Sequence, residues 1–304
     1  MKQALITGSC GFIGRHVASC FAQFGWDVIG IGHGHWAQNE CKSWGIRRWH
    51  NGDVTLQNLQ QLNFVPNTVV HCAGAGSVAT ALEEPGESFE RTVGTTVHLL
   101  EFIRQFAPEA PLILTSSVAV CGDTPVAPIS EQTPDNPVSP YGLMKQQAEQ
   151  LCLMYGKFFG VKSARVRLFS VYGPGLQKQI MWDICQKILR GALHLHGTGS
   201  ETRDFLHVID AARLLYEAQR AATMVSPVIN GGTGIGTTVG SLVDMIVREF
   251  GGPNNSQFSG RHRPGDPAVY VADTFRSLSL GWKPEIDLQV GIKEYVDWFR
   301  SANL

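Results

Sequence analysis

A short apolar strand, a glycine-rich turn and an amphipathic helix follow one another at the start of this chain. The strand is expected at residues 2–7 and the helix at about 12–24, where apolar side chains recur at helical spacing. The turn between them contains Gly8, Gly11 and Gly14. Glycines there let the backbone approach a pyrophosphate, whose negative charge is favoured by the N-terminus of the following helix. This order of elements predicts a parallel α/β fold that begins with a dinucleotide-binding site.

The same alternation of strands and helices continues to about residue 172. Further strands are expected at residues 27–31, 46–49, 68–71, 111–115 and 162–168, and further helices near 77–83, 87–106 and 141–159. Such an order predicts a Rossmann-type, doubly wound parallel sheet with right-handed crossovers. After Pro174 short elements alternate with glycine turns, which predicts a smaller C-terminal α/β lobe for the substrate. We expect the dinucleotide-binding domain at residues 1–173 and about 204–235, and the lobe at about 174–203 and 236–304.

Composition and charge narrow the class of protein. The 304 residues carry a net charge of -1 with a sequence pI near 6.8, which gives no reason to expect nucleic acid or an anionic membrane surface as a partner. No apolar run reaches the roughly 18 residues of a membrane-spanning helix, and the chain starts with a strand and not a charged leader, so we expect a cytoplasmic protein. The seven cysteines are scattered and odd in number, and we expect reduced thiols. The histidine pairs His33/His35 and His194/His196 lack a carboxylate or cysteine at metal-ligand spacing, so no metal site is predicted.

Tyr141 and Lys145 are four residues apart in an expected helix, and this spacing places both side chains on one face. A phenol has an unperturbed pKa of about 10, and a nearby ammonium stabilises its phenolate. The pair can therefore exchange a proton with an alcohol or a carbonyl. The alternative is two neighbours on a solvated helix face, and the dinucleotide-binding turn upstream argues against it. Ser116 and Ser117 lie in Thr-Ser-Ser-Val and not in the Gly-x-Ser-x-Gly turn of a serine hydrolase.

Further short motifs accompany the glycine-rich turn and the Tyr141–Lys145 pair, and they follow one another along nearly the whole chain. They lie at residues 52–54, 69–74, 114–117, 120–122, 167–175, 202–205, 230–234 and 263–266. Together the motifs resemble the extended short-chain dehydrogenase/reductase family, in its NAD-dependent epimerase/dehydratase branch, whose members modify nucleotide sugars. The resemblance implies an enzyme of carbohydrate biosynthesis that binds a nucleotide-diphosphate sugar and NAD or NADP.

The resemblance also implies roles for individual residues. Ser117 is expected to hydrogen-bond the reacting sugar oxygen, Tyr141 to transfer its proton, and Lys145 to lower the phenol pKa and hold the nicotinamide ribose. The adjacent Ser116 remains an alternative to Ser117. The residues expected to bind the cofactor are Gly8, Cys10, Gly11, Phe12, Ile13, Gly14, Gly32, His33, Asp53, Val54, Cys72, Ala73, Gly74, Thr92, Thr115, Tyr141, Lys145 and Ser170.

The substrate is expected to contact Ser117, Arg203, Arg263 and Asp266. Guanidinium groups suit the oxygens of a diphosphate, although a surface salt bridge remains the alternative for each arginine. Asp204 and Asp210 are expected to shape the junction of the lobes, and His71 to be structural.

The residues after Ser117 bear on the reaction. Dehydratases of the family carry Asp-Glu there and its decarboxylases need a Glu at the second position, whereas this chain has Val118 and Ala119, which do not titrate. Hydride transfer without elimination remains. We favour an epimerase that transiently oxidises a sugar carbon, C4 by analogy with relatives, and keep an NAD(P)H-dependent 4-keto-sugar reductase as the alternative. A non-catalytic cofactor-binding protein is disfavoured because the serine, tyrosine and lysine are all kept.

Two departures from the family pattern concern the cofactor. The acidic residue that would bond the adenosine ribose is replaced by Gly32, and His33, Arg47 or Arg48 could supply positive charge for a 2′-phosphate. This favours NADP and leaves NAD open. Thr92 stands where the family has an Asn, which predicts a shifted helix or a changed water contact.

The chain is expected to form a homodimer. The helices near 87–106 and 141–159 carry more apolar positions than one buried face needs. These are Phe102, Ile103, Phe106, Leu151, Leu153, Met154 and Phe158. In the family the corresponding helices pair with their symmetry mates in a four-helix interface, which this surplus suits.

Overall fold

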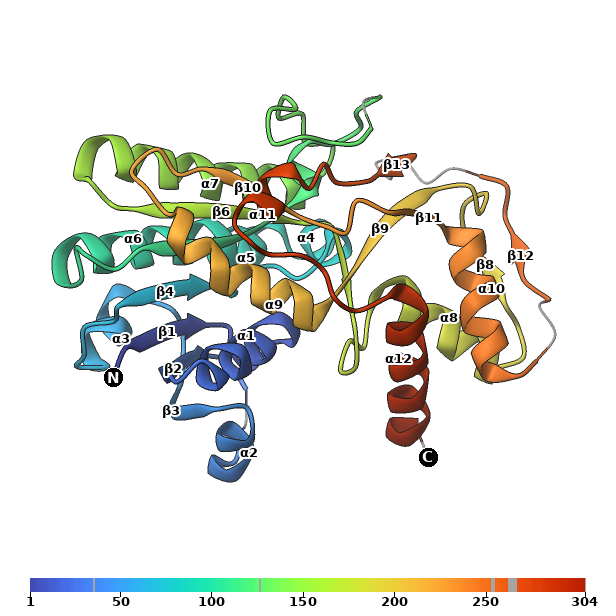
Figure 1. Cartoon of the computed structure of the whole chain (residues 1–304), viewed down its shortest axis with the longest axis horizontal. Helices are drawn as coiled ribbons and strands as arrows, with labels where there is room; N and C mark the ends of the chain where they lie inside the picture. Colours follow the sequence, from blue (N-terminus) through green and yellow to red (C-terminus); the bar gives the residue numbers. More distant parts are fainter. Residues whose placement is uncertain (35, 126, 253–254, 262–266, 304) are drawn as a thin grey trace.

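The computed structural model describes residues 1–34, 36–125, 127–252, 255–261 and 267–303 of the chain. Its centre is a sheet of seven parallel strands in the order β10-β6-β5-β4-β1-β2-β3 (Figure 1). The strands are β1 (Gln3–Thr7), β2 (Asp27–Gly32), β3 (Ile46–Asn51), β4 (Thr68–His71), β5 (Leu112–Ser117), β6 (Ser163–Leu168) and β10 (Val228–Gly231). The predicted Rossmann-type sheet is confirmed, because all the expected strands are present with ends shifted by at most two residues.

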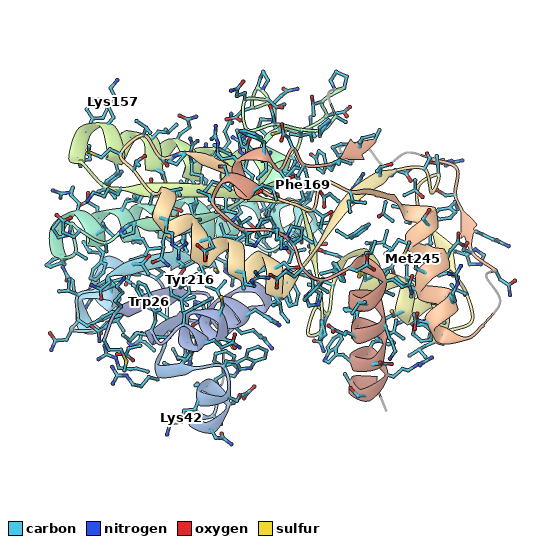
Figure 2. All side chains as sticks on the ribbon, viewed as in Figure 1. Trp26, Lys42, Lys157, Phe169, Tyr216 and Met245 are labelled. Atoms are coloured by element: carbon cyan, nitrogen blue, oxygen red, sulfur yellow. The ribbon has the colours of Figure 1, made fainter. Side chains whose placement is uncertain are left out.

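Helices cover both faces of this sheet. On one face α1 (Phe12–Gln23) and α9 (Val208–Glu217) share an apolar core with the strands, and Trp26 and Tyr216 pack edge to face beside them, with ring centroids 6.4 Å apart (Figure 2). On the other face lie α3 (Leu56–Gln61), α6 (Thr95–Phe106) and α7 (Pro140–Phe159). Alternate strand residues point to opposite faces, so most residues of the strands covered on both sides are buried.

The remaining helices of the main sheet are short. They are α2 (Gln38–Ser43), α4 (Val78–Glu83), α5 (Pro85–Phe89), α11 (Phe275–Ser279) and the 3-10 turns η2 (Val118–Val120) and η3 (Ala218–Ala221). Neither α2 nor α3 was expected from the sequence. Each has six residues, which is fewer than two helical turns and too short for a periodic apolar pattern.

The helix expected over residues 87–106 is interrupted. A π-helical turn, η1 (Glu90–Gly94), separates α5 from α6. Within it the Thr92 carbonyl accepts a hydrogen bond from Thr96 Oγ1 at 2.6 Å. Hydroxyls that bond back to the helix often bend it, and π-helical turns are frequent at functional sites. The interruption includes Thr92, where a shifted helix was expected.

A smaller lobe follows the main sheet (Figure 1). In it β9 (Thr202–His207) pairs with β7 (Ser170–Tyr172), β11 (Gly236–Thr238) and β13 (Val269–Tyr270), while β8 (His194–Leu195) pairs with β12 (Gln257–Phe258). The helices α8 (Gln179–Leu189), α10 (Val239–Phe250) and α12 (Leu288–Asn303) share a second apolar core, with Met245 of α10 packed against it (Figure 2). The predicted C-terminal α/β lobe is therefore confirmed. Because β9 crosses the boundary expected near residue 204, the division into residue ranges remains a prediction.

The surplus of apolar residues on α6 and α7 is smaller than expected. Phe102 and Ile103 are 2% and 0% exposed and belong to the core of the chain itself, so including them was wrong. Phe106, Met154 and Phe158 are exposed. Of the seven positions expected at the interface these three are exposed, and Leu151 and Leu153 are half-buried.

Other expectations concern metals, membranes and thiols. Within the described ranges no helix is long and apolar enough to cross a membrane. The same residues contain no group of three or more His, Cys, Asp or Glu side chains that could hold a metal ion. His194 and His196 are exposed, and all seven cysteines are free thiols.

Candidate functional site

The glycine-rich turn joins β1 to α1 at the centre of the sheet, where the strand order reverses. Gly8 has φ +63°, and a Cβ built there would lie 2.7 Å from Ala73 N, beyond the end of β4. A Cβ on Gly14 would lie 2.2 Å from the Gly8 carbonyl oxygen. Glycine is therefore required at both positions by close backbone contacts. The turn leaves room for a ligand backbone to approach, and such crevices at the carboxyl ends of strands are where open α/β sheets bind ligands.

His71 fixes the neighbouring strand end. Its Nδ1 lies 2.7 Å from Thr7 Oγ1 and its Nε2 lies 3.2 Å from Thr95 Oγ1. Burial lowers the pKa of His71 to about 3, and the Lys145 charge acts in the same direction. The imidazole is therefore neutral, and it links β1, β4 and α6. This geometry supports the structural role expected for it.

Ser117, Tyr141 and Lys145 meet where β5 ends and α7 begins. Ser139 caps α7 by accepting a hydrogen bond from Gly142 N at 3.1 Å. A Cβ on Gly142 would lie 2.4 Å from the Ala119 carbonyl oxygen, so the first turn of α7 packs directly on the turn that follows Ser117. This contact brings the expected catalytic side chains to one place.

Burial and neighbouring groups shift the pKa values of Tyr141 and Lys145. Burial raises the pKa of Tyr141, and a hydrogen bond with Ser117 opposes that shift. Lys145 is 6% exposed; its Nζ donates to the Thr115 carbonyl at 2.9 Å and lies 5.9 Å from the centroid of the Tyr141 ring. Burial lowers the pKa of Lys145 to about 8, while Cys72 and Glu149 act in the opposite direction. A lysine of this kind can hold or release a proton near neutral pH.

Ser116 faces away from this pair. Its Oγ donates to Glu149 Oε1 at 2.5 Å, in a fully buried position. Ser117 is half-buried, and its Oγ accepts a hydrogen bond from Ala119 N at 3.2 Å. The geometry favours Ser117 over Ser116 as the hydroxyl that can reach a substrate.

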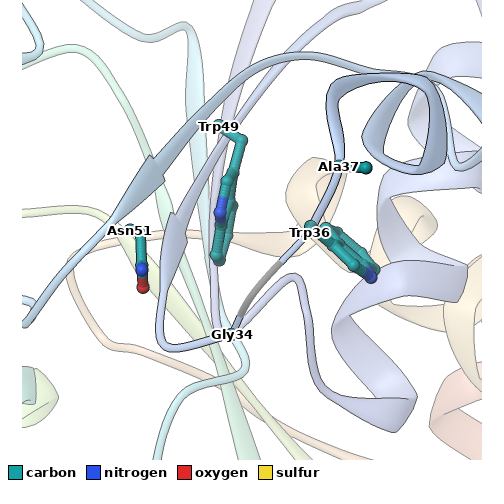
Figure 3. A pocket seen from close by; sticks show the side chains of 5 residues that line it. All are labelled: Gly34, Trp36, Ala37, Trp49 and Asn51. Atoms are coloured by element: carbon teal, nitrogen blue, oxygen red, sulfur yellow. The ribbon is translucent and has the colours of Figure 1, made fainter.

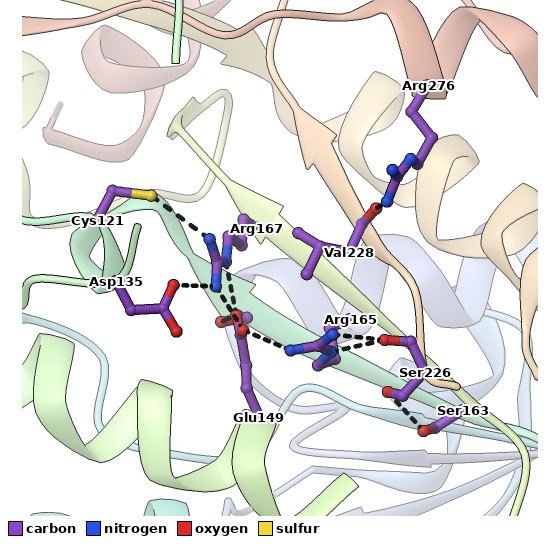
Figure 4. A network of polar contacts seen from close by, with 10 residues as sticks. Cys121, Asp135, Glu149, Ser163, Arg165, Arg167, Ser226, Val228 and Arg276 are labelled. Carbon is purple, nitrogen blue, oxygen red and sulfur yellow. Dashed lines mark hydrogen bonds and ion pairs between the residues drawn. The ribbon is translucent and has the colours of Figure 1, made fainter. Parts of the chain in front are cut away.

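A buried ionic network lies behind the serine pair (Figure 4). Glu149 is 0% exposed, and its Oε2 accepts from Arg165 Nη1 at 3.1 Å and from Arg167 Nη2 at 2.7 Å. Arg167 also donates to Asp135 Oδ1 at 2.6 Å, and Arg165 donates twice to the Ser226 carbonyl. Two buried guanidinium groups thus face two carboxylates, which fixes α7 against β6. This network was not predicted from the sequence, where Arg165 and Arg167 stand out only as two charged residues at alternate positions of an expected strand.

Four further residues expected at the cofactor, Cys72, Gly74, Thr92 and Thr115, lie around the same strand ends. Thr92 Oγ1 accepts a hydrogen bond from Ala75 N at 3.0 Å, and a Cβ on Gly74 would lie 3.5 Å from Lys145 Nζ. Cys72 Sγ lies 3.5 Å from Thr115 Oγ1, and burial raises the pKa of Cys72 to about 11. These contacts place the end of β4, the π-helical turn and the lysine next to one another.

A cavity of about 320 Å³ opens beyond β2 and β3 (Figure 3). It is lined by Gly34, Trp36, Ala37, Trp49 and Asn51. Among the described residues that line it none carries a carboxylate, and β2 itself ends at Gly32. This is the position where an acidic side chain would meet the adenosine ribose of NAD.

The positive charges expected beside this cavity are engaged elsewhere. Arg47 forms an ion pair with Asp27 through two hydrogen bonds, so expecting it at a 2′-phosphate was wrong. Arg48 lies over the Phe64 ring at 5.2 Å, and His33 Nε2 lies 2.7 Å from Asp53 Oδ1. None of the three is an isolated cation at the cavity.

Arg15 is the cation beside the cavity that the sequence analysis missed. Its guanidinium lies 5.8 Å from the Trp36 ring centroid and 5.5 Å from that of Trp44. Its Nη2 donates to the Cys10 carbonyl at 2.8 Å. Arg15 follows the last glycine of the turn directly, and that position could have been noticed.

The substrate residues expected in the lobe are only partly described. Arg203 lies on β9 with its guanidinium 5.5 Å from the Tyr270 ring centroid. Arg263 and Asp266 lie outside the described residues. Asp204 is fully buried and accepts hydrogen bonds from the backbone N–H groups of Thr233 and Gly234 at 2.7 and 2.8 Å.

The second expected junction residue is also buried. Asp210 accepts from the N–H groups of Glu285 and Ile286 at 3.0 and 2.9 Å. Asp204 and Asp210 thus tie separate segments of the chain together, in keeping with the structural role expected for them.

A parallel α/β sheet with a glycine-rich turn beside a serine, a tyrosine and a lysine defines a dinucleotide-dependent enzyme of the extended short-chain dehydrogenase/reductase type. A sequence profile of the NAD dependent epimerase/dehydratase family matches residues 4–230. The chain belongs to this family, as its motifs predicted.

Relatives and solved structures align over nearly the full length. A protein of Methanocaldococcus jannaschii, provisionally named a UDP-glucose 4-epimerase, is 31% identical over 306 residues, covering 98% of this chain and 99% of that protein. The UDP-glucose 4-epimerase of Thermotoga maritima, solved with UDP-glucose, is similar with a TM-score of 0.90 and 26% identity, covering 99% of this chain and 100% of that one. The UDP-glucuronic acid 4-epimerase of Bacillus cereus, solved with UDP-glucuronic acid and NAD, has a TM-score of 0.88 and 25% identity, covering 99% of both chains.

Proposed function

We propose that this protein is a UDP-sugar 4-epimerase that acts by transient oxidation at C4 of the sugar. The observation that carries the proposal is the contact of Gly142 with Ala119, which sets Tyr141 and Lys145 against Ser117 beside the glycine-rich turn. The names of the similar proteins support the substrate class and the reacting carbon.

The residues of the chain handle the proton. The Ser117 hydroxyl holds the C4 oxygen by a hydrogen bond, and Tyr141 accepts the proton of the C4 hydroxyl as the carbonyl forms. Burial raises the pKa of Tyr141, and the Lys145 ammonium, 5.9 Å from the centre of its ring, is the charge that we propose favours the phenolate against that burial. A dinucleotide held against Gly8 and Gly14 would supply the acceptor and donor of the hydride. Once the 4-keto sugar has rotated to present its other face for hydride return, Tyr141 gives the proton back to the C4 oxygen.

The cofactor proposed for this site is NADP(H), bound at least as well as NAD(H). The support is the absence of a carboxylate at Gly32 and among the residues lining the cavity. Arg15 lies over the ring of Trp36, which lines that cavity, and we propose it in place of Arg47 and Arg48 as the cation for the 2′-phosphate. The complex of the Bacillus cereus relative contains NAD, so an NADP(H) preference would distinguish this chain from that relative.

The lack of a carboxylate at Gly32, which favours NADP(H), also suggests a second candidate function. An enzyme that prefers NADPH can deliver hydride to a keto sugar supplied by another enzyme, which is reduction without epimerisation. Epimerase and reductase differ in stoichiometry. The first interconverts two sugars with no net consumption of cofactor, whereas the second consumes one NAD(P)H for each product.

The test is an assay of the purified protein with UDP-glucose, UDP-galactose and UDP-glucuronate, with products identified by NMR. We expect formation of the C4 epimer of at least one substrate while the absorbance of NAD(P)H at 340 nm stays constant. Stoichiometric oxidation of NADPH with a 4-keto sugar would favour the reductase. A 4-keto-6-deoxy product from a UDP-hexose would defeat both.

A further inference from the structure

Polar contacts one helical turn apart hold α7 on β5. Lys145 Nζ donates to the Thr115 carbonyl oxygen at 2.9 Å, and Ser116 Oγ donates to Glu149 Oε1 at 2.5 Å. Lys145 and Glu149 are four residues apart, so both lie on the face of the helix that packs against this strand. The next residue of β5 is Ser117. These contacts therefore fix the ammonium and the Ser117 hydroxyl relative to each other.

Lys145 is buried, and among the described residues no ion pair contains it. The titratable groups around it are His71 and Cys72 at the end of β4, and Tyr141 and Glu149 on α7 itself. The strand β5 contributes an uncharged carbonyl. Burial lowers the pKa of His71 to about 3 and raises that of Cys72 to about 11, so the imidazole and the thiol are uncharged near neutral pH. Burial also raises the pKa of Tyr141, which keeps its phenol protonated.

Glu149 is the negative charge that acts on this ammonium. Burial lowers the pKa of Lys145 to about 8, and Cys72 and Glu149 oppose that shift. Because the thiol is uncharged near neutral pH, the opposition there comes from the carboxylate. Other charged residues lie on the π-helical turn η1, where Glu90 is exposed and Arg91 forms an ion pair with a glutamate of α5.

The Glu149 carboxylate is held in place by its own partners (Figure 4). It accepts hydrogen bonds from Arg165 Nη1 at 3.1 Å and from Arg167 Nε and Nη2 at 2.9 and 2.7 Å. Arg167 also donates to Asp135 Oδ1 at 2.6 Å. Two carboxylates and two guanidinium groups balance one another, so loss of the Glu149 charge leaves an excess positive charge one helical turn from Lys145.

We propose that Glu149 is a positioning residue of this site, which acts through Lys145 by balancing its buried ammonium and by holding it in register with Ser117. The inference rests on the proposed function, in which Lys145 must be charged to favour the phenolate of Tyr141. Glu149 is 0% exposed, so its effect on turnover passes through these neighbours and not through contact with the sugar. Without its carboxylate the ammonium should be lost at a lower pH.

Four variants separate the charge of Glu149 from its contacts. Glu149→Gln removes the charge and keeps the shape, whereas Glu149→Asp keeps the charge on a shorter side chain. Ser116→Ala removes the contact with β5 and leaves every charge in place. Asp135→Asn is the matched control, because it removes a carboxylate of the same network that contacts Arg167 and is not among the groups acting on Lys145.

The first measurement needs neither cofactor nor substrate. In protein labelled with carbon-13 in its lysine side chains, the NMR resonance of Lys145, assigned with Lys145→Arg, reports its protonation as the pH is varied. We expect a midpoint near pH 8 in the wild type. In Glu149→Gln it should be lower by at least about 0.5, since charges about 6 Å apart on one helix face interact even in water. Glu149→Asp and Ser116→Ala should keep the wild-type midpoint, and Asp135→Asn should lower it by less than Glu149→Gln.

The second measurement is the pH dependence of kcat/KM for epimerisation. In the wild type kcat/KM should fall above about pH 8, as the Lys145 ammonium is lost. In Glu149→Gln the fall should move to lower pH by the same amount as the NMR midpoint. A purely structural role would instead lower kcat/KM equally at every pH.

Three results would overturn the inference. They are a folded Glu149→Gln protein in which Lys145 titrates as in the wild type, a shift in Asp135→Asn as large as in Glu149→Gln, and a shifted midpoint with an unchanged pH dependence of kcat/KM. If Glu149→Gln does not fold, Glu149→Gln/Arg165→Met takes its place, since it removes one charge of each sign and leaves Arg167 paired with Asp135. The NMR titration does not depend on turnover, so the proposed function fails separately, if the wild-type protein epimerises no UDP-sugar.

Discussion

Glu149 is the residue whose removal should destabilise the fold most clearly. It accepts hydrogen bonds from Ser116, Arg165 and Arg167, and its side chain is 0% exposed. In Glu149→Gln the shape is kept while one negative charge is lost. The guanidinium groups, with side chains 10% and 3% exposed, would then face Asp135 as the only carboxylate of the network described here.

The expected loss of folding free energy in Glu149→Gln follows from the burial of these charged groups. Removing one partner of a buried ion pair costs about 3–5 kcal/mol, because an uncompensated charge stays in a medium of low polarity. The amide also turns an N–H donor toward a guanidinium that can only donate. A domain of ordinary stability, about 5–15 kcal/mol, would remain folded at 25 °C but with a melting temperature lowered by roughly 6 °C or more.

The assay is urea denaturation of the wild type, Glu149→Gln and a control. Glu87→Gln is the control, since Glu87 pairs with Arg91 on an exposed helix where both side chains are about half exposed. Loss of such a surface pair changes the free energy of unfolding by less than about 1 kcal/mol. If Glu149→Gln also stays within about 1 kcal/mol of the wild type, the network does not hold α7 against β6 as inferred.

Further predictions test the chemistry, the cofactor and the assembly. Tyr141→Phe should lower turnover by about 10²- to 10⁴-fold and leave cofactor binding intact, because only the proton-transferring hydroxyl is lost; activity within about threefold of wild type would exclude that role. Lys145 should titrate near pH 8 in the folded chain and near 10.5 when unfolded. The folded state therefore releases the proton first, and stability relative to Lys145→Met should rise as the pH increases from about 8 to 10 in denaturation experiments; a flat difference would contradict the shift. Gly32→Asp should shift preference toward NAD(H), and Arg15→Met should weaken NADP(H) binding more than NAD(H) binding; a strong NAD(H) preference in fluorescence titrations of the wild type would rule out this site. Light scattering should give a mass twice the 33.2 kDa of the chain, and Phe158→Glu should lower it; a monomeric wild type at micromolar concentration would oppose the dimer.

Local features of the sequence were enough to predict the sheet and the catalytic spacing. Most of the central strands contain short apolar runs, and Tyr141 and Lys145 share a face through their spacing alone. The glycines of the first turn predicted close backbone contacts, and a Cβ at Gly8 or Gly14 would indeed clash with backbone. Each of these inferences depends on neighbours within a few residues in the chain.

Contacts between distant segments could not be predicted in the same way. Arg47 was considered as a source of positive charge for a 2′-phosphate, but Asp27 on the neighbouring strand binds it. Arg165 and Arg167 alternate like the solvated face of an edge strand, yet β6 lies between β5 and β10 and they face Glu149. Pairings of this kind depend on which elements become neighbours, and a charge pattern within one element does not contain that information.

Val118, which stands after Ser117 where the family's dehydratases carry an acid, is packed among apolar side chains. Val118 is 5% exposed and belongs to an apolar cluster with Cys121, Ile129 and Phe169. A carboxylate in its place would be buried among apolar side chains, which either raises its pKa or destabilises the fold. Acquiring the Asp that the family's dehydratases carry would therefore require this cluster to be repacked, whereas proton transfer by Tyr141 requires no change. The packing thus supports hydride transfer without elimination as the chemistry of this site.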